Sequence, residues 1–187
     1  MADTYYAVYT NKFAPQNTTA WDDILNQYAL VEQNLRVNTT AFPNGTAQGL
    51  LYHGYDASLK AVWAVPPTGH CLEVWNRAIG WYAMALVDIL EVFPKSHPGW
   101  NQLRGYLQRL APELVLAADK ASGAWWLVMG YPNRAGNYIE SSGSAMFVYS
   151  LLKGVRKGYL PKSNYVKTAK KAYEYLEKTF VVPETNG

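Results

Sequence analysis

The sequence predicts an all-α fold in which hairpins, each with an inner and an outer helix, form part of a ring. Two observations favour this fold. Segments of two kinds alternate: one is apolar nearly all round after a polar start, and the other has one polar face. The first kind should be buried as inner helices, and the second should form an outer layer. Apolar residues also recur with the helical period, most clearly in residues 21–37, at Ile24, Tyr28, Val31 and Leu35.

Six helices follow from these patterns. Thr19 can cap the second, where Asp22 and Asp23 lie near the positive end of the helix dipole. Pro112 should kink the fourth helix or split it in two. The expected helices span residues 1–13, 21–37, 73–93, 98–121, 140–157 and 165–180.

The connecting segments repeat as well. Residues 49–56 and 122–128 each place aromatic residues after a glycine and should be extended, the first as a hairpin or an open loop. Loops rich in polar residues and proline are expected at 38–48 and 57–72. The repeat is one of organisation rather than of identity. Residues 1–187 are expected to form one domain, which is long enough for a sizeable core.

The start of the third helix carries a candidate site for an anionic sugar. Arg77 and Trp81 are four residues apart and share one helix face, and Trp75 and Ile79 share a neighbouring face. A guanidinium can hold a sugar carboxylate through two parallel hydrogen bonds while the sugar ring packs against an indole. The alternative is a buried tryptophan with an arginine that extends past it to water.

In a ring of hairpins, the polar N-termini of the inner helices converge on one mouth. Asp3 at the first inner helix and Arg77 with Trp81 at the second should therefore point to the same place. The start of the fifth helix should add further polar groups there, namely Glu140, Ser141, Ser142 and Ser144.

The composition favours a flat-faced ligand such as a carbohydrate, because the chain holds 15 Tyr and 7 Trp. A net charge of +3 without a basic stripe argues against nucleic acid as a partner. No segment is long and apolar enough to predict a membrane span. The lone Cys71 excludes an internal disulfide and a cysteine metal cluster, so neither a metal nor a cofactor is expected.

Three tripeptides of the N-glycosylation type, at Asn17, Asn38 and Asn44, are crowded into the expected loops. Their clustering favours a secreted eukaryotic parent protein. The chain opens with Met1, Ala2 and Asp3 and shows no signal peptide. A secreted parent therefore implies that these residues are a piece of a longer protein.

Four segments carry a family resemblance: residues 49–56 (GLLYHGYD), 75–82 (WNRAIGWY), 137–144 (NYIESSGS) and 153–160 (KGVRKGYL). With the spacing of 24 from His53 to Arg77, they resemble glycoside hydrolase family 105, the unsaturated rhamnogalacturonyl hydrolases, over nearly the whole chain. The resemblance implies an (α/α)6 barrel, consistent with the ring. It also implies hydrolysis of the bond between rhamnose and the 4,5-unsaturated galacturonyl residue that pectin lyases leave.

The resemblance implies roles for single residues. Asp3 matches the aspartate of a Trp-x-Asp segment, which protonates the double bond of the sugar and activates water; the resulting hemiketal opens and releases rhamnose. His53 matches a histidine that supports the site, and Arg77 and Trp81 match residues that contact the sugar. Met1 stands where the tryptophan of that segment is expected. Further candidate sugar contacts are Trp75, Ser141 and Ser144.

Barrels of this family have about twice the present length, so the chain resembles the middle of such an enzyme. The hairpins expected before Asp3 would carry a second active-site aspartate. Half a ring leaves two apolar flanks exposed, more than a soluble monomer usually tolerates. We therefore expect the chain to dimerise, to bind the missing barrel segments as separate chains, or to be ordered only as a cleavage product.

Simpler structural roles are open for several of these residues. Asp3 could be a helix cap, His53 a core histidine, and Glu140 to Ser144 a capped helix start in which serines satisfy unpaired N–H groups. Cys71 could be a nucleophile, although no acid is in place to orient the neighbouring His70. Outside the expected site lie His70, His97, and Asp88 with Glu91, the last two on an outward polar face.

Two other functions are consistent with the residues. One is a non-catalytic helical module that binds acidic sugars or assembles with itself. The other is hydrolysis of unsaturated glycosaminoglycan, the reaction of a sister family. The main hypothesis expects an unsaturated pectin-derived oligosaccharide as partner, with the chain inactive alone or active only once its flanks are supplied.

Overall fold

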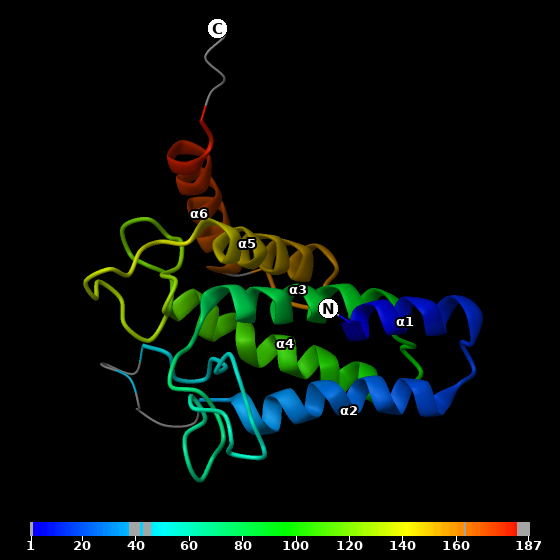
Figure 1. Ribbon diagram of the computed structural model, residues 1–187. Coiled ribbons are helices and arrows are strands. Elements are labelled where there is room, and N and C mark those ends of the chain that lie inside the picture. The colour runs from blue at the N-terminus through cyan, green and yellow to red at the C-terminus, as the bar shows by residue number, and fades with distance from the viewer. Residues whose placement is uncertain (1, 38–41, 43–45, 163, 183–187) are drawn as a thin grey trace, which may run out of the picture.

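The computed structural model describes residues 2–37, 42, 46–162 and 164–182, and within them six helices form three hairpins (Figure 1). The same residues form isolated β-bridges and no longer strand. The predicted all-α class is confirmed. The hairpins are α1 (Ala2–Phe13) with α2 (Thr18–Leu35), α3 (Asn76–Val92) with α4 (Gly99–Leu116), and α5 (Ser141–Arg156) with α6 (Asn164–Phe180).

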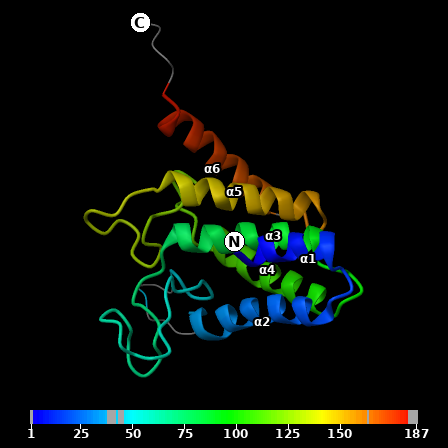
Figure 2. The same ribbon diagram turned by 45° about the vertical axis from the view of Figure 1, so that its right-hand side comes forward.

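The helices form the predicted inner and outer layers. α3 packs against α1 on one side and α5 on the other, while α4 packs against α2 and α6. The loops that precede α3 and α5 lie at the same end of the molecule in both views, and the short hairpin turns lie at the opposite end (Figures 1 and 2). The inner helices α1, α3 and α5 therefore run in the same direction, and α3 and α5 begin at the same end, whereas α1 begins beside the middle of α3 (Figures 1 and 2).

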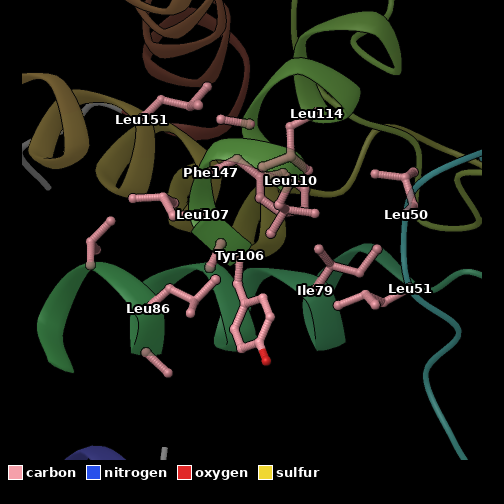
Figure 3. Close-up of a cluster of buried hydrophobic side chains, with 14 of the residues drawn as sticks. Leu50, Leu51, Ile79, Leu86, Tyr106, Leu107, Leu110, Leu114, Phe147 and Leu151 are labelled. Atoms are coloured by element: carbon pink, nitrogen blue, oxygen red, sulfur yellow. The ribbon is translucent and has the colours of Figure 1, made fainter. Parts of the chain in front are cut away.

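A core of apolar side chains joins α3, α4 and α5 (Figure 3). Phe147 of α5 meets Trp125 edge to face with ring centroids 5.0 Å apart, and both side chains are fully buried. The Trp125 indole N–H donates to the carbonyl of Leu114 near the end of α4, 2.7 Å away. Leu51 lies beside Ile79 of α3 in Figure 3 and extends this core to the loop of residues 49–56.

The loop of residues 49–56 is extended, which agrees with the second of the two forms expected for it. Leu51 bridges to Arg36 just after α2, and Tyr55 bridges to His70. At the end of the loop, Asp56 accepts hydrogen bonds from a serine hydroxyl and from backbone N–H groups of the following turn, which lower its pKa to about 2. The loop is thus fixed to its surroundings at three points.

The start of α2 differs from the prediction. The helix begins at Thr18, and Asn17 caps it in place of Thr19: the Asn17 side-chain oxygen accepts from the Ala20 N–H at 3.1 Å. Asn17 is exposed, and its glycosylation stays a prediction. Asn38 and Asn44, the other two glycosylation candidates, lie outside the described residues.

Two further details differ from the expectations: the fourth helix does not split at Pro112, and Trp75 lies before the third helix. α4 runs as one helix through Pro112, four residues before its end. A proline in the last turns removes a backbone hydrogen bond where little helix remains to be supported, so the helix does not split. Trp75 precedes α3 as its N-cap residue and forms a β-bridge with Val128. It therefore does not share a helical face with Ile79.

The polar face expected for Asp88 and Glu91 is only partly outward: Glu91 is exposed, whereas Asp88 is half-buried, and both pair with α5. Lys153 of α5 donates to the Asp88 carboxylate at 2.8 Å and also pairs with Glu91. Tyr149 donates to Asp88 at 2.9 Å. Burial alone lowers the pKa of Lys153, but its hydrogen bonds to the two carboxylates outweigh burial and raise the pKa above its usual value. These side chains link α3 to α5.

Candidate functional site

A cavity of about 290 Å³ brings together three of the predicted site residues. Asp3 comes from the start of α1, His53 from the loop of residues 49–56, and Trp81 from the second turn of α3. The cavity lies between the start of α1, the first turns of α3, the second half of α2 and the loop of residues 49–56. Aromatic and aliphatic side chains with one amide complete its wall: Gln27, Tyr28, Val31, Leu35, Leu51, Tyr52, Ala78, Ile79 and Tyr82.

The geometry around His53 determines which of its ring nitrogens serves a ligand. Its Nδ1 lies 2.8 Å from the Glu73 carbonyl oxygen, which can only accept, so Nδ1 carries the hydrogen and donates it. Nε2 of the neutral ring is then left as an acceptor. The Cys71 sulfur lies 3.1 Å from the same Nδ1 and donates to the same carbonyl at 3.3 Å. The Trp75 ring lies beside the imidazole, at 6.1 Å between centroids.

A buried carboxylate supports the cavity wall from behind. Tyr82 donates its hydroxyl hydrogen to Glu32 of α2 at 2.8 Å. Glu32 also accepts from Arg36 Nε at 2.9 Å and from Arg109 of α4 at 3.2 Å. Burial, followed by the negative charge of Glu32, raises the pKa of Tyr82 well above its usual value. Tyr82 therefore stays a neutral donor, and α2, α3 and α4 are tied together at the site.

Arg77 lies next to the cavity rather than in its lining. Its guanidinium and the Trp81 side chain, one turn further along α3, are 45% and 44% exposed. The guanidinium lies 3.9 Å from a carboxylate oxygen of Glu140 at the start of α5. An ion pair of this length at an exposed side chain contributes little to stability. Arg77 is therefore held loosely enough to meet a carboxylate ligand.

Glu140 is a helix cap. One carboxylate oxygen accepts from the Ser142 hydroxyl at 2.7 Å and its N–H at 3.2 Å, and the other accepts from the Gly143 N–H at 2.7 Å. Burial alone raises the pKa of Glu140, but these hydrogen bonds and the charge of Arg77 outweigh it and lower the pKa below its usual value. The capped-start interpretation of Glu140 and Ser142 is thus the one the geometry favours.

The serines of α5 do not join the cavity. Ser144 is fully buried, and its hydroxyl oxygen accepts the Trp125 backbone N–H at 3.0 Å. A sugar contact by Ser144, which the sequence suggested, does not fit this geometry because the hydroxyl serves the core. Ser141 and Ser142 line a separate groove between α5 and α6. Among the contacts described above, the one that links the start of α5 to Arg77 is made by the Glu140 carboxylate.

Glu140→Gln should lower the free energy of unfolding at pH 7 by about 1 kcal/mol, the usual value of a helix cap. The amide offers one acceptor oxygen, whereas both carboxylate oxygens accept here. Because the pKa of Glu140 is lowered in the folded chain, its stabilisation is complete above the usual carboxyl pKa and is lost as the pH falls through the lowered one. Urea titrations of both proteins from pH 7 downward should show the difference shrink; a difference that grows in acid would contradict this assignment.

The remaining histidines and Cys71 have structural roles. His70 stacks on Tyr52 with centroids 4.0 Å apart, and His97 lies 3.2 Å from Asp22. Cys71 is 2% exposed, which leaves a substrate no access to its thiol. Within the residues described, no group of three or more His, Cys, Asp or Glu side chains is placed to hold a metal ion. In the same residues, no helix has the length and apolar character for crossing a bilayer.

The Glu32 cluster is the part of the site that sequence reasoning missed. Glu32 stands four residues after Tyr28, on the apolar face of the predicted helix, where a charge is out of place. A charged residue on the apolar face of a helix indicates that its carboxylate has a partner in the folded chain. Arg36 lies four residues after Glu32 in the same predicted helix, so its pairing could be expected from the spacing. Tyr82 and Arg109 come from two other helices, and their pairing with Glu32 could not be predicted from the sequence.

Comparison with known proteins finds glycoside hydrolases of families 88 and 105. The model of Glycosyl Hydrolase Family 88 matches residues 1–187. A solved family 105 glycoside hydrolase of C. acetobutylicum superposes with a TM-score of 0.89 and 43% sequence identity, over 99% of this chain and 48% of that one. The resemblance to family 105 and the assignment to part of an (α/α)6 barrel are thereby confirmed.

Two curated proteins are also similar to the chain in sequence. Protein Atu3128 of Agrobacterium fabrum is 41% identical over 132 residues, which are 70% of this chain and 56% of that protein. The unsaturated rhamnogalacturonyl hydrolase YesR of Bacillus subtilis is 28% identical over 104 residues, 55% of this chain and 27% of that enzyme. The chain thus spans about half the length, or less, of the proteins it matches.

Proposed function

The chain belongs to glycosyl hydrolase family 88, and from this premise we propose that it carries part of the active site of an unsaturated rhamnogalacturonyl hydrolase. The substrate would be a 4,5-unsaturated galacturonyl residue joined to rhamnose. One observation carries the proposal: Asp3, His53 and Trp81, from three separate segments, line one cavity. A similar enzyme, YesR, is named for this activity.

The reaction needs one group that gives a proton and then takes one. Asp3 is the one carboxylate among the described residues that line the cavity. In its acid form it protonates the alkene of the sugar; as a carboxylate it then takes a proton from water, whose oxygen bonds to the other alkene carbon. Water is thereby added across the double bond. The hemiketal opens to a ketone and the bond to rhamnose breaks.

The other residues bind and orient the sugar. The exposed indole of Trp81 offers a flat surface for the ring, and Arg77 one turn before it can hold the sugar carboxylate through two N–H groups. His53, with Nδ1 donating to the Glu73 carbonyl, presents Nε2 as acceptor for a sugar hydroxyl. The Glu32 cluster holds Tyr82 and hence the wall between α2 and α3.

Turnover is tested by incubating the purified chain, together with the barrel segments that flank it, with the unsaturated galacturonyl-rhamnose disaccharide and following the loss of alkene absorbance; the chain without those segments is expected to be inactive. We expect loss of absorbance and release of rhamnose, faster than with an unsaturated glucuronyl disaccharide from glycosaminoglycan. Faster loss with the second substrate would reassign the chain to the sister activity.

A non-catalytic role in binding acidic sugars is the second candidate, and the single carboxylate in the described cavity lining favours it. Calorimetry separates the two functions. Binding of the disaccharide that survives Asp3→Asn, with no turnover even when the flanking barrel segments are supplied, would support the binding module and contradict the enzyme.

A further inference from the structure

A second cavity of about 290 Å³ lies between the end of α4 and the first half of α6, and three of its lining residues are lysines. Lys120 comes from the turn after α4, and Lys167 and Lys171 come from α6. Both walls belong to helices that pack against each other within the described chain. The described lining of this lysine cavity has no residue in common with that of the cavity that contains Asp3.

Lys171 is fixed in the wall of the lysine cavity. Its ammonium group donates a hydrogen bond to the Lys120 carbonyl at 2.6 Å, and its methylene stem lies over Gly123. Gly123 has a φ of +75°, and a side chain there would come within 2.8 Å of the stem. A lysine ammonium carries three N–H groups. The described contacts use one of them, so the other two can serve a ligand.

The acidic residue in the same lining does not balance this positive charge. Asp119 accepts from the Ser122 hydroxyl at 2.8 Å and from the N–H groups of Ser122 and Ala121 at 2.7 and 3.1 Å. Burial alone raises the pKa of Asp119, but these hydrogen bonds outweigh it and lower the pKa. Among the described residues, no ion pair joins the three lysines to an acid. Three lysines against one aspartate leave the described lining with a net charge of +2.

The positions of the lysines on α6 do not favour the folded chain. Lys167 and Lys171 are four residues apart, and like charges at this spacing repel each other on a helix surface. Lys167 also lies in the first turn of α6, where the positive end of the helix dipole disfavours a cation. An anion in the lysine cavity would turn both effects into attraction.

We propose that the lysine cavity binds a carboxylate of an acidic oligosaccharide and is a second sugar site, separate from the proposed active site. Lysine binds carboxylates as a compact point charge with donors that rotate to suit the ligand. The hydroxyl of Thr168 in the same lining can bond a sugar hydroxyl. A volume of about 290 Å³ suits one uronate unit rather than several. The choice of a uronate rests on the proposed function, whereas the choice of an anion rests on the lysines.

Lysine acetylation by acetic anhydride, mapped by peptide mass spectrometry, tests the proposal on the chain together with its flanking barrel segments. Saturated trigalacturonate, which has no alkene to be hydrated, should slow acetylation of Lys120, Lys167 and Lys171, with saturation as its concentration rises. Lys178 is exposed in the last turn of α6 outside the lining and is the matched control; its rate should not change. Neutral maltotriose should protect none of them.

A double variant separates binding in the lysine cavity from binding elsewhere. Lys167→Gln combined with Lys171→Gln should raise the trigalacturonate concentration needed to protect Lys120 by at least about tenfold, because hydrogen bonds from charged groups are lost. Lys178→Gln should leave that concentration unchanged. Both changes are at exposed positions, and circular dichroism establishes that the helices are intact.

Three results would overturn the second sugar site. The first is no protection of the three lysines, and the second is equal protection of Lys178, which would mean diffuse attraction of an anion to α6. The third is equal protection by inorganic phosphate at the same ionic strength, which would mean a site for any anion. None of these measurements uses turnover. Protection without turnover would therefore contradict the proposed enzyme alone, and turnover without protection would contradict the lysine cavity alone.

Discussion

Asp3→Asn should reduce the rate of alkene loss by a factor on the order of 10²–10⁴, the range that general acid–base groups contribute. An amide neither gives a proton to the alkene nor takes one from water. The change keeps the size and polarity of the side chain, so the cavity that Asp3 shares with His53 and Trp81 should persist. Binding of the disaccharide, measured by calorimetry, should change by less than about tenfold.

Asp23→Asn is the matched control, since Asp23 is an exposed aspartate of the first turns of α2 and lies outside the cavity lining. It should keep the wild-type rate. If Asp3→Asn retained the wild-type rate, the hydration chemistry would have to come from another group. If both variants lost activity equally, the loss would come from removing a negative charge and not from removing the proton-transferring carboxyl group of Asp3.

Glu32→Gln should lower the free energy of unfolding by about 3 kcal/mol, the low end of the cost of breaking a buried ion pair. The neutral side chain leaves Arg36, whose side chain is 15% exposed, without its counter-charge, and weakens the bond from Tyr82. Arg109 is 54% exposed and regains water, which places the estimate at the low end. Urea unfolding at pH 7 measures the change.

Glu174→Gln provides the comparison, because it makes the same chemical change at an exposed position of α6. This replacement should change the stability by less than about 0.5 kcal/mol. A loss below about 1 kcal/mol for Glu32→Gln would show that the cluster behind Tyr82 is not a support of the cavity.

The fold could be predicted because its signals are local. The alternation of all-apolar and amphipathic segments is a property of the chain, and it led to inner helices α1, α3 and α5 that run in the same direction. The grouping of Asp3 with Trp81 followed from that geometry. The place of His53 came from the family resemblance, since a loop residue carries no periodic signal.

What could not be predicted depends on pairings between distant segments. Ser144 is two residues from Ser142 and of the same type, yet one serves the Trp125 backbone and the other the helix cap. Asp88 is spaced like a surface residue, and only the arrival of Lys153 from α5 makes it part of an interface. Such roles are decided by which helix packs beside which.

The crystal structure of Asp3→Asn with the unsaturated galacturonyl-rhamnose disaccharide tests the central claim most directly. We predict the unsaturated ring in the cavity, against the Trp81 indole, with its alkene at residue 3 and its carboxylate at Arg77. Disaccharide bound in the groove between α5 and α6, or in the cavity with its alkene turned away from residue 3, would contradict it.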